Sequence, residues 1–132
     1  MLYGSQRARQ RLAAKRVWLA VKSVNQRAVM LAHNVFFTLK DGSEAARQKL
    51  VAACKHYLVK HPGILFFATG TLAADLNRPV NVRDFDVALH IVFTSKEDHD
   101  RYQAAPAHVR FVEENKESWK QVRVFDSVVE KS

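Results

Sequence analysis

The clearest pattern along the chain is an alternation of apolar and polar residues with period two, which is typical of β-strands that bury one face. In the first such segment His33, Val35 and Phe37 share one face, while Phe36 lies on the other. Short apolar runs rich in β-branched and aromatic residues indicate strands elsewhere. Together these patterns predict strands at residues 31–40, 64–72, 85–94 and 119–129.

Two segments show helical spacing instead. Residues 44–60 place apolar side chains on one helical face, after a turn that ends in the capping residue Ser43. Ser95 caps the start of a second helix, and Pro106 interrupts it, because proline lacks a backbone donor and disfavours helical geometry in the preceding residue. We therefore expect two short helices joined at a kink, and a long polar loop at residues 73–84 before the third strand.

The resulting order, β-α-β-β-α-β, predicts an α+β, ferredoxin-like fold with one antiparallel four-stranded sheet and both helices on one face. The other face is then uncovered, although it is expected to carry Phe36, Ala88 and Val92. A bare apolar sheet face usually marks a partner. We therefore predict a homodimer that forms through this sheet face.

The net charge of +8 comes from one end of the chain. Residues 1–29 hold seven basic and no acidic side chains, which leaves 14 basic and 13 acidic side chains in residues 30–132. The charge therefore predicts no nucleic-acid binding by the folded domain at residues 30–132.

The N-terminal extension, residues 1–29, is open to several interpretations. It could be disordered, or an amphipathic basic helix on an acidic membrane or nucleic acid, or an organelle-targeting peptide. We favour a fourth interpretation, in which translation starts at Met30 and residues 1–29 belong to an over-extended reading frame. The apolar face of such a helix would consist of Ala14, Val17, Trp18, Val21, Val24 and Ala28.

Two features bear on the compartment. The single cysteine, Cys54, cannot form an intramolecular disulfide, which fits a reducing, cytoplasmic setting. No apolar run approaches the ~18 residues that a membrane span needs, so none is expected.

Candidate chemistry lies around the predicted kink, where Tyr102 would end one short helix and His108 would begin the next. This geometry could direct a phenol and an imidazole to one cavity, and His33 should point to the same side of the sheet. A tyrosine and a histidine on an amphipathic helix are, however, often core-edge residues with no chemical role. The sequence alone leaves both interpretations open.

The remaining histidines offer weaker signals. His90 falls on the opposite sheet face, towards the predicted dimer interior, whereas His56, His61 and His99 are expected in solvated positions. They lack the spacing and the cysteine partners of a zinc site, so no metal site is predicted. The acidic pair at residues 113–114 is most simply a solvated helix face, although hard-cation ligands such as these carboxylates remain an alternative.

Several segments together resemble the stress-responsive α/β-barrel (Dabb) family over residues 30–129. The most specific is Y-Q-A-A-P-A-H at residues 102–108, which matches the family's Tyr-x-x-His-Pro-x-His signature except at Ala105. Others are the strands H-N-V-F-F-T-L-K and F-D-V-A-L-H-I-V-F-T-S, the helix end H-P-G and the closing W-K-Q-V-R-V-F-D. The resemblance implies a small dimeric barrel in which two sheets pack face to face.

The family includes the plant polyketide cyclase olivetolic acid cyclase, and this implies roles for particular residues. Tyr102 and His108 match its acid/base pair for cofactor-free ring closure, and His33 matches a pocket histidine. A pocket tyrosine and another pocket histidine of that enzyme fall at Cys54 and Val87, so the same substrate is not expected. The pocket is expected to be mostly apolar, with walls from Val35, Phe37, Cys54, Val87, Leu89 and Phe111.

We therefore predict a pocket in each subunit that binds an aromatic or polyketide-like molecule, with cofactor-free, cyclase-like acid/base chemistry as one outcome. A stress-related binding or structural dimer module without catalysis is the main alternative. A cofactor-free monooxygenase of the related barrel group is the second, and it predicts oxygen consumption with quinol-like substrates. The residues do not decide whether the protein is an enzyme.

Overall fold

The computed structural model describes residues 2–132, with the side chains of residues 6–19 and 29–132. The chain divides into two compact units, Met1–Val29 with Glu130–Ser132, and Met30–Val129. Each unit is described separately below.

Helix α1 (Leu2–Ala28) makes up most of the first unit. Its side chains at residues 6–19 are all exposed. Val21, Val24 and Ala28, which belong to the predicted apolar face, lie outside the described side chains. Within the described part of the chain, no helix is both long and apolar enough to cross a membrane.

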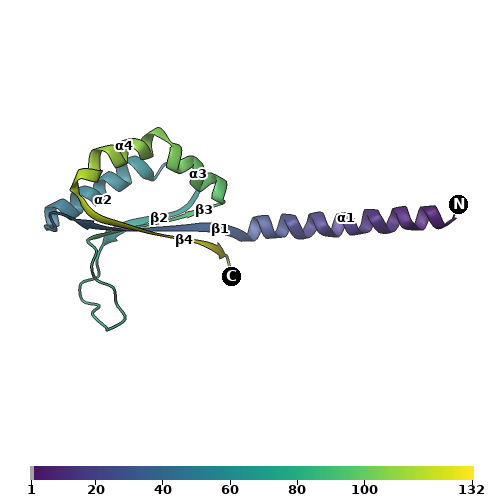
Figure 1. Cartoon of the computed structure of the whole chain (residues 1–132), viewed down its shortest axis with the longest axis horizontal. Coiled ribbons are helices and arrows are strands. Elements are labelled where there is room, and N and C mark those ends of the chain that lie inside the picture. The colour runs from purple at the N-terminus through teal and green to yellow at the C-terminus, as the bar shows by residue number, and fades with distance from the viewer. Residues whose placement is uncertain (1) are drawn as a thin grey trace. The chain divides into compact units, whose positions relative to one another are not determined.

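The second unit is a four-stranded sheet in the order β2-β3-β1-β4, with β3 antiparallel to both of its neighbours. Its helices α2, α3 and α4 cover one side of the sheet, and the loop between β2 and β3 extends from the other side (Figure 1). The predicted ferredoxin-like α+β fold is therefore confirmed. The elements are β1 (Val29–Leu39), α2 (Glu44–Leu58), β2 (Ile64–Thr71), β3 (Val87–Phe93), α3 (Lys96–Ala104), α4 (Pro106–Asn115), a 3₁₀ turn η1 (Lys116–Ser118) and β4 (Trp119–Glu130).

Local sequence signals explain where the helices begin and bend. The hydroxyl of Ser43 accepts a hydrogen bond from the Ala46 amide at 3.2 Å, and Ser95 caps α3 in the same way. Ala105 is extended, with φ −64° and ψ 142°, and Pro106 is the first residue of α4. The predicted kink is confirmed, because the proline excludes helical geometry from the residue before it.

A glycine is required at the connection between α2 and β2. Gly63 has a φ of 90°, which disfavours any residue with a Cβ atom. A Cβ there would also lie 2.4 Å from Cγ of Asp98, in the first turn of α3. The turn at Gly63 therefore packs directly against the first turn of α3.

The hydrophobic core lies between the helices and the sheet. Leu50, Cys54 and Leu58 of α2 are at most 2% exposed, and Ile91 and Phe93 of β3 are fully buried. This agrees with the predicted spacing of the helix and with the alternation in the strand. The strand residues of the candidate site lie on this same side of the sheet, facing the helices.

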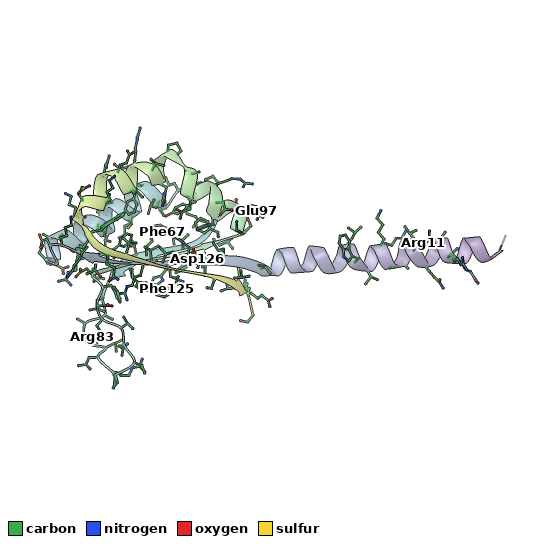
Figure 2. The ribbon with its side chains drawn as sticks, viewed as in Figure 1. Arg11, Phe67, Arg83, Glu97, Phe125 and Asp126 are labelled. Atoms are coloured by element: carbon green, nitrogen blue, oxygen red, sulfur yellow. The ribbon has the colours of Figure 1, made fainter. Side chains whose placement is uncertain are left out.

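The opposite sheet face is open and aromatic. The ring of Phe36 lies 4.9 Å from that of Phe85 and 5.7 Å from that of Phe125, centroid to centroid. Phe66 and Phe125 remain 55% and 57% exposed. Figure 2 shows Phe67 on the helix side of the sheet and Phe125 on the other side. The predicted apolar face is therefore present, with no cover from the residues described.

Candidate active site

A cavity of about 180 Å³ lies between the sheet and the helices α3 and α4. Its polar wall consists of His33, Tyr102, Gln103 and His108. The rest of the wall is apolar and comes from β1, β3, α4 and β4. These residues are Val35, Phe37, Leu89, Phe111, Val112, Trp119, Val122 and Val124.

The structure brings most of the predicted site residues to this cavity. Its wall includes the three polar candidates and the predicted apolar residues except Cys54 and Val87. Those two are fully buried in the core. Val87 pairs with Phe37 at the end of its strand, and Cys54 faces Thr69 on β2. Both side chains are enclosed in the core between the helices and the sheet, so neither reaches the cavity and the prediction is wrong for these two residues.

Tyr102 and His108 lie side by side at the kink, with ring centroids 4.8 Å apart. Tyr102 is only 2% exposed, and burial raises the pKa of its hydroxyl, with repulsion from Cys54 as a second cause. The phenol is therefore protonated at neutral pH. Burial is also the largest cause of the lowered pKa of His108, although a hydrogen bond to the backbone of Gln103 acts in the opposite direction. The imidazole is thus neutral at pH 7 and can accept a proton.

His33 is buried and bonded to an acidic residue. Its Nδ1 lies 2.5 Å from Oδ1 of Asp126, and its side chain is 5% exposed against 42% for Asp126. Burial lowers the pKa of His33, and this outweighs the hydrogen bond and the charge of Asp126, which raise it. The Asp126 carboxylate therefore orients a mostly neutral imidazole, whose ring centre is 6.0 Å from that of Tyr102.

Asp126 was not among the predicted site residues, although the strand pattern carries a signal for it. On β4, Asp126 shares a face with Val122 and Val124 because side chains alternate along a strand. Those two valines line the cavity. Figure 2 shows the position of Asp126 on β4.

Two histidines expected in solvated positions are instead partly buried next to residues of the site. The ring of His99 lies 5.0 Å from His33 and 5.6 Å from Phe93, and its side chain is 16% exposed. His61 lies 5.6 Å from Tyr102. His99 precedes Tyr102 by three residues, so both side chains lie on the face of α3 that packs on the sheet.

The other predictions for polar residues agree with the structure. His56 and Glu113 are exposed. His90 is on the open sheet face, where its Nδ1 lies 2.6 Å from Oδ1 of Asn34. Glu114 is also exposed, and its carboxylate accepts a hydrogen bond from the hydroxyl of Tyr57.

A second hollow, of about 210 Å³, also has Tyr102 and His108 in its wall. Its other residues include Tyr57, His61 and Pro62, at the C-terminal end of α2 and in the turn after it. The tyrosine–histidine pair is therefore shared by the inner cavity and by this outer hollow. A ligand in either space would contact both polar side chains.

Comparison with family models gives a match to the Stress responsive A/B Barrel Domain over residues 31–129. The chain belongs to this family, called Dabb. The match covers the whole second unit except its first residue, and it includes the kink and the cavity. A comparison with curated proteins found no match.

Solved structures with the same fold include one described as a Dabb family protein. A Dabb protein from Mesorhizobium loti aligns with a TM-score of 0.64 and 23% identity, over 75% of this chain and 95% of that one. A hydroxynitrile lyase from Passiflora edulis aligns with a TM-score of 0.63 and 21% identity, over 78% and 95%. A dimeric ferredoxin-like protein of unknown function from Thermobifida fusca aligns with a TM-score of 0.63 and 12% identity, over 78% and 93%. At these identities the likeness shows a shared fold.

Proposed function

We propose that this Dabb domain binds a small aromatic or polyketide-like molecule in the cavity and catalyses proton transfer on it without a cofactor. The observation that carries the proposal is the convergence of Tyr102, His108 and His33 on one mostly apolar cavity, with Asp126 bonded to His33 from outside the cavity wall. An apolar pocket with a few convergent polar groups is the usual form of a small-molecule site. The likeness to a hydroxynitrile lyase supports the idea that this fold can hold an enzyme site.

The neutral imidazole of His108 would act as the base and remove a proton from a carbon next to a carbonyl group. The hydroxyl of Tyr102 would donate a hydrogen bond to the carbonyl oxygen as negative charge develops there. The resulting enolate carbon would attack a second carbonyl in the same molecule and close a ring, and the protonated His108 would return its proton to the alkoxide oxygen that forms. His33, held by Asp126, would orient the substrate.

The pKa directions suit these roles. The lowered pKa of His108 keeps the base unprotonated at pH 7, and the raised pKa of Tyr102 keeps the donor protonated up to strongly alkaline pH. Turnover is therefore expected to rise with pH below 6.5 and then to stay level through pH 9. General acid/base groups contribute on the order of 10²–10⁴-fold in rate.

The test measures proton removal directly. Small β-diketones and polyketide mimics are incubated with the protein in D₂O, and deuterium incorporation at the acidic carbon is followed by NMR. Exchange above the buffer rate is expected, with a loss of about 100-fold or more in His108→Gln and a smaller loss in Tyr102→Phe. His56→Gln is the matched control, because His56 is exposed and outside the cavity.

The outcomes separate the alternatives. A folded His108→Gln protein with full exchange would remove the base role from this residue. Saturable ligand binding with no exchange in the wild-type protein would favour the non-catalytic binding module. Oxygen consumption with quinol-like substrates would favour the monooxygenase.

We also propose that the protein is a homodimer through its open sheet face. The dimeric description of the Thermobifida fusca structure supports this. The exposed aromatic residues of the sheet give the physical reason, because a face-to-face pair would remove them from water.

A further inference from the structure

Three side chains with metal-ligating groups come together beside the cavity, and one of them, His33, also lines it. They are His33 on β1, His99 on α3 and Asp126 on β4, and one donor atom from each can be chosen so that all lie within 4.8 Å of one another. The three residues are far apart in sequence, and the packing of α3 over the sheet brings them together. The proposed acid/base chemistry makes no use of His99.

The two imidazoles are held in place by their surroundings. Nδ1 of His99 lies 3.0 Å from Oδ1 of Asp100, a contact in which the carboxylate fixes the ring and leaves Nε2 available as a ligand. A carboxylate or carbonyl behind the ligating histidine is usual in metal sites. The ring of His33 is packed against Phe93 and Tyr102, with centroids 6.2 Å and 6.0 Å away.

The carboxylate of Asp126 is the most exposed member of the cluster and provides access from solvent. The side chain of Asp126 is 42% exposed, whereas the side chains of His33 and His99 are 5% and 16% exposed. Oδ1 of Asp126 now lies 2.5 Å from Nδ1 of His33. Two ligand atoms on one zinc ion are about 3.4 Å apart, as its bond lengths and tetrahedral angles require. A rotation of Asp126 that moves its oxygen by about 1 Å would therefore admit an ion in place of the shared proton.

We propose that His33, His99 and Asp126 form a binding site for a divalent transition-metal ion of the zinc type. Two imidazoles and one carboxylate suit such ions, whereas magnesium and calcium prefer oxygen ligands alone. Three protein ligands leave a fourth position open, as in zinc sites that bind water or substrate. The ion would lie beside Tyr102, next to the cavity. Because it would bind the imidazole of His33, this side chain would not be free to orient a substrate while the ion is bound.

Isothermal titration of the full chain with ZnCl₂, after treatment with a chelator, tests this proposal. We expect one zinc ion per chain. His99→Gln and Asp126→Asn should each weaken zinc binding by about 100-fold or more, and Asp100→Asn by about 10-fold, in line with the effects of ligands and of the groups that orient them. His56→Gln, at an exposed histidine of α2, should bind zinc as the wild-type protein does.

Cobalt supplies a second readout, because Co²⁺ bound in a four- or five-coordinate site of this kind absorbs strongly in the visible range. Circular dichroism of each variant confirms that it is folded. Zinc binding that is lost in both folded ligand variants supports the site. No saturable binding in the wild-type protein, or binding unchanged in either ligand variant, would overturn it. Neither readout depends on turnover, so the result is independent of the proposed acid/base function.

Discussion

At the scale of single residues, opposing effects set the protonation of the two cavity histidines. Burial lowers the pKa of His33 by more than the adjacent carboxylate of Asp126 raises it, so the pKa lies below 6.5. His108 is also partly buried, and repulsion from His33 lowers its pKa further. Each site is therefore built to hold a neutral imidazole. This form can accept a proton or bind a metal ion.

The same residues predict how stability depends on pH. In the unfolded chain both histidines titrate near the ordinary histidine pKa of 6.5, whereas in the folded domain their pKa values are lower. As pH falls below 6.5, the unfolded state binds protons first, so the free energy of unfolding decreases. Their stabilising contribution is complete above pH 6.5 and is lost as pH falls through the lowered folded pKa values.

Urea unfolding at pH 7.5, 6.5 and 5.5 measures this effect. We expect the midpoint to fall across this range, and to fall less steeply in His108→Gln, which has no group to protonate there. His56→Gln is the control for the replacement of an exposed histidine outside the cavity. An identical pH dependence in wild type and His108→Gln would show that this side chain does not contribute.

At the scale of elements, local rules were enough to locate the strands, the helices and the kink at Pro106. Period-two alternation, serine caps and the backbone restrictions of proline all act within a few residues. The His33–Asp126 contact joins positions 93 residues apart and depends on how β4 is positioned beside β1. No local pattern specifies that position. The site of His99, in contrast, could have been inferred from its spacing to Tyr102.

Helix α3 carries both His99 and Tyr102, so its N-terminal cap should affect the site. The hydroxyl of Ser95 accepts a hydrogen bond from the Asp98 amide at 3.2 Å. Ser95→Ala leaves this amide without its partner and should lower the free energy of unfolding by about 1 kcal/mol. Hydrogen exchange should become faster in the first turn of α3.

Ser43→Ala is the matched control for this prediction. Ser43 caps α2 through the same type of bond, 3.2 Å from the Ala46 amide. Its loss should cost a similar free energy but should speed exchange in α2 and leave α3 unchanged. Equal exchange changes in α3 for both variants would mean that the cap effect is global and not local to the site.

At the scale of the whole domain, one copy of Met30–Val129 leaves the aromatic side chains of the open sheet face exposed to solvent. A shallow hollow of about 340 Å³ lies on it, lined by Phe36, Val82, Phe85, Arg123 and Phe125. The loop that precedes β3 is held by Arg83, whose guanidinium donates hydrogen bonds to the carbonyls of Leu76 and Ala74 at 2.7 Å and 2.9 Å. This ordered loop borders the aromatic hollow and extends from the same side of the sheet (Figures 1 and 2).

A single charged side chain introduced on this face should dissociate the predicted dimer into monomers. In a two-fold symmetric pair each substitution occurs twice, so Phe125→Glu would bury two unpaired carboxylates in an apolar interface. We expect the variant to be monomeric by light scattering at concentrations where the wild-type protein is dimeric, with an unchanged circular dichroism spectrum. Val109→Glu, at a residue that is 44% exposed on α4, is the control and should remain dimeric. A monomeric wild-type protein, or a Phe125→Glu dimer as stable as the wild type, would show that the aromatic face has another role.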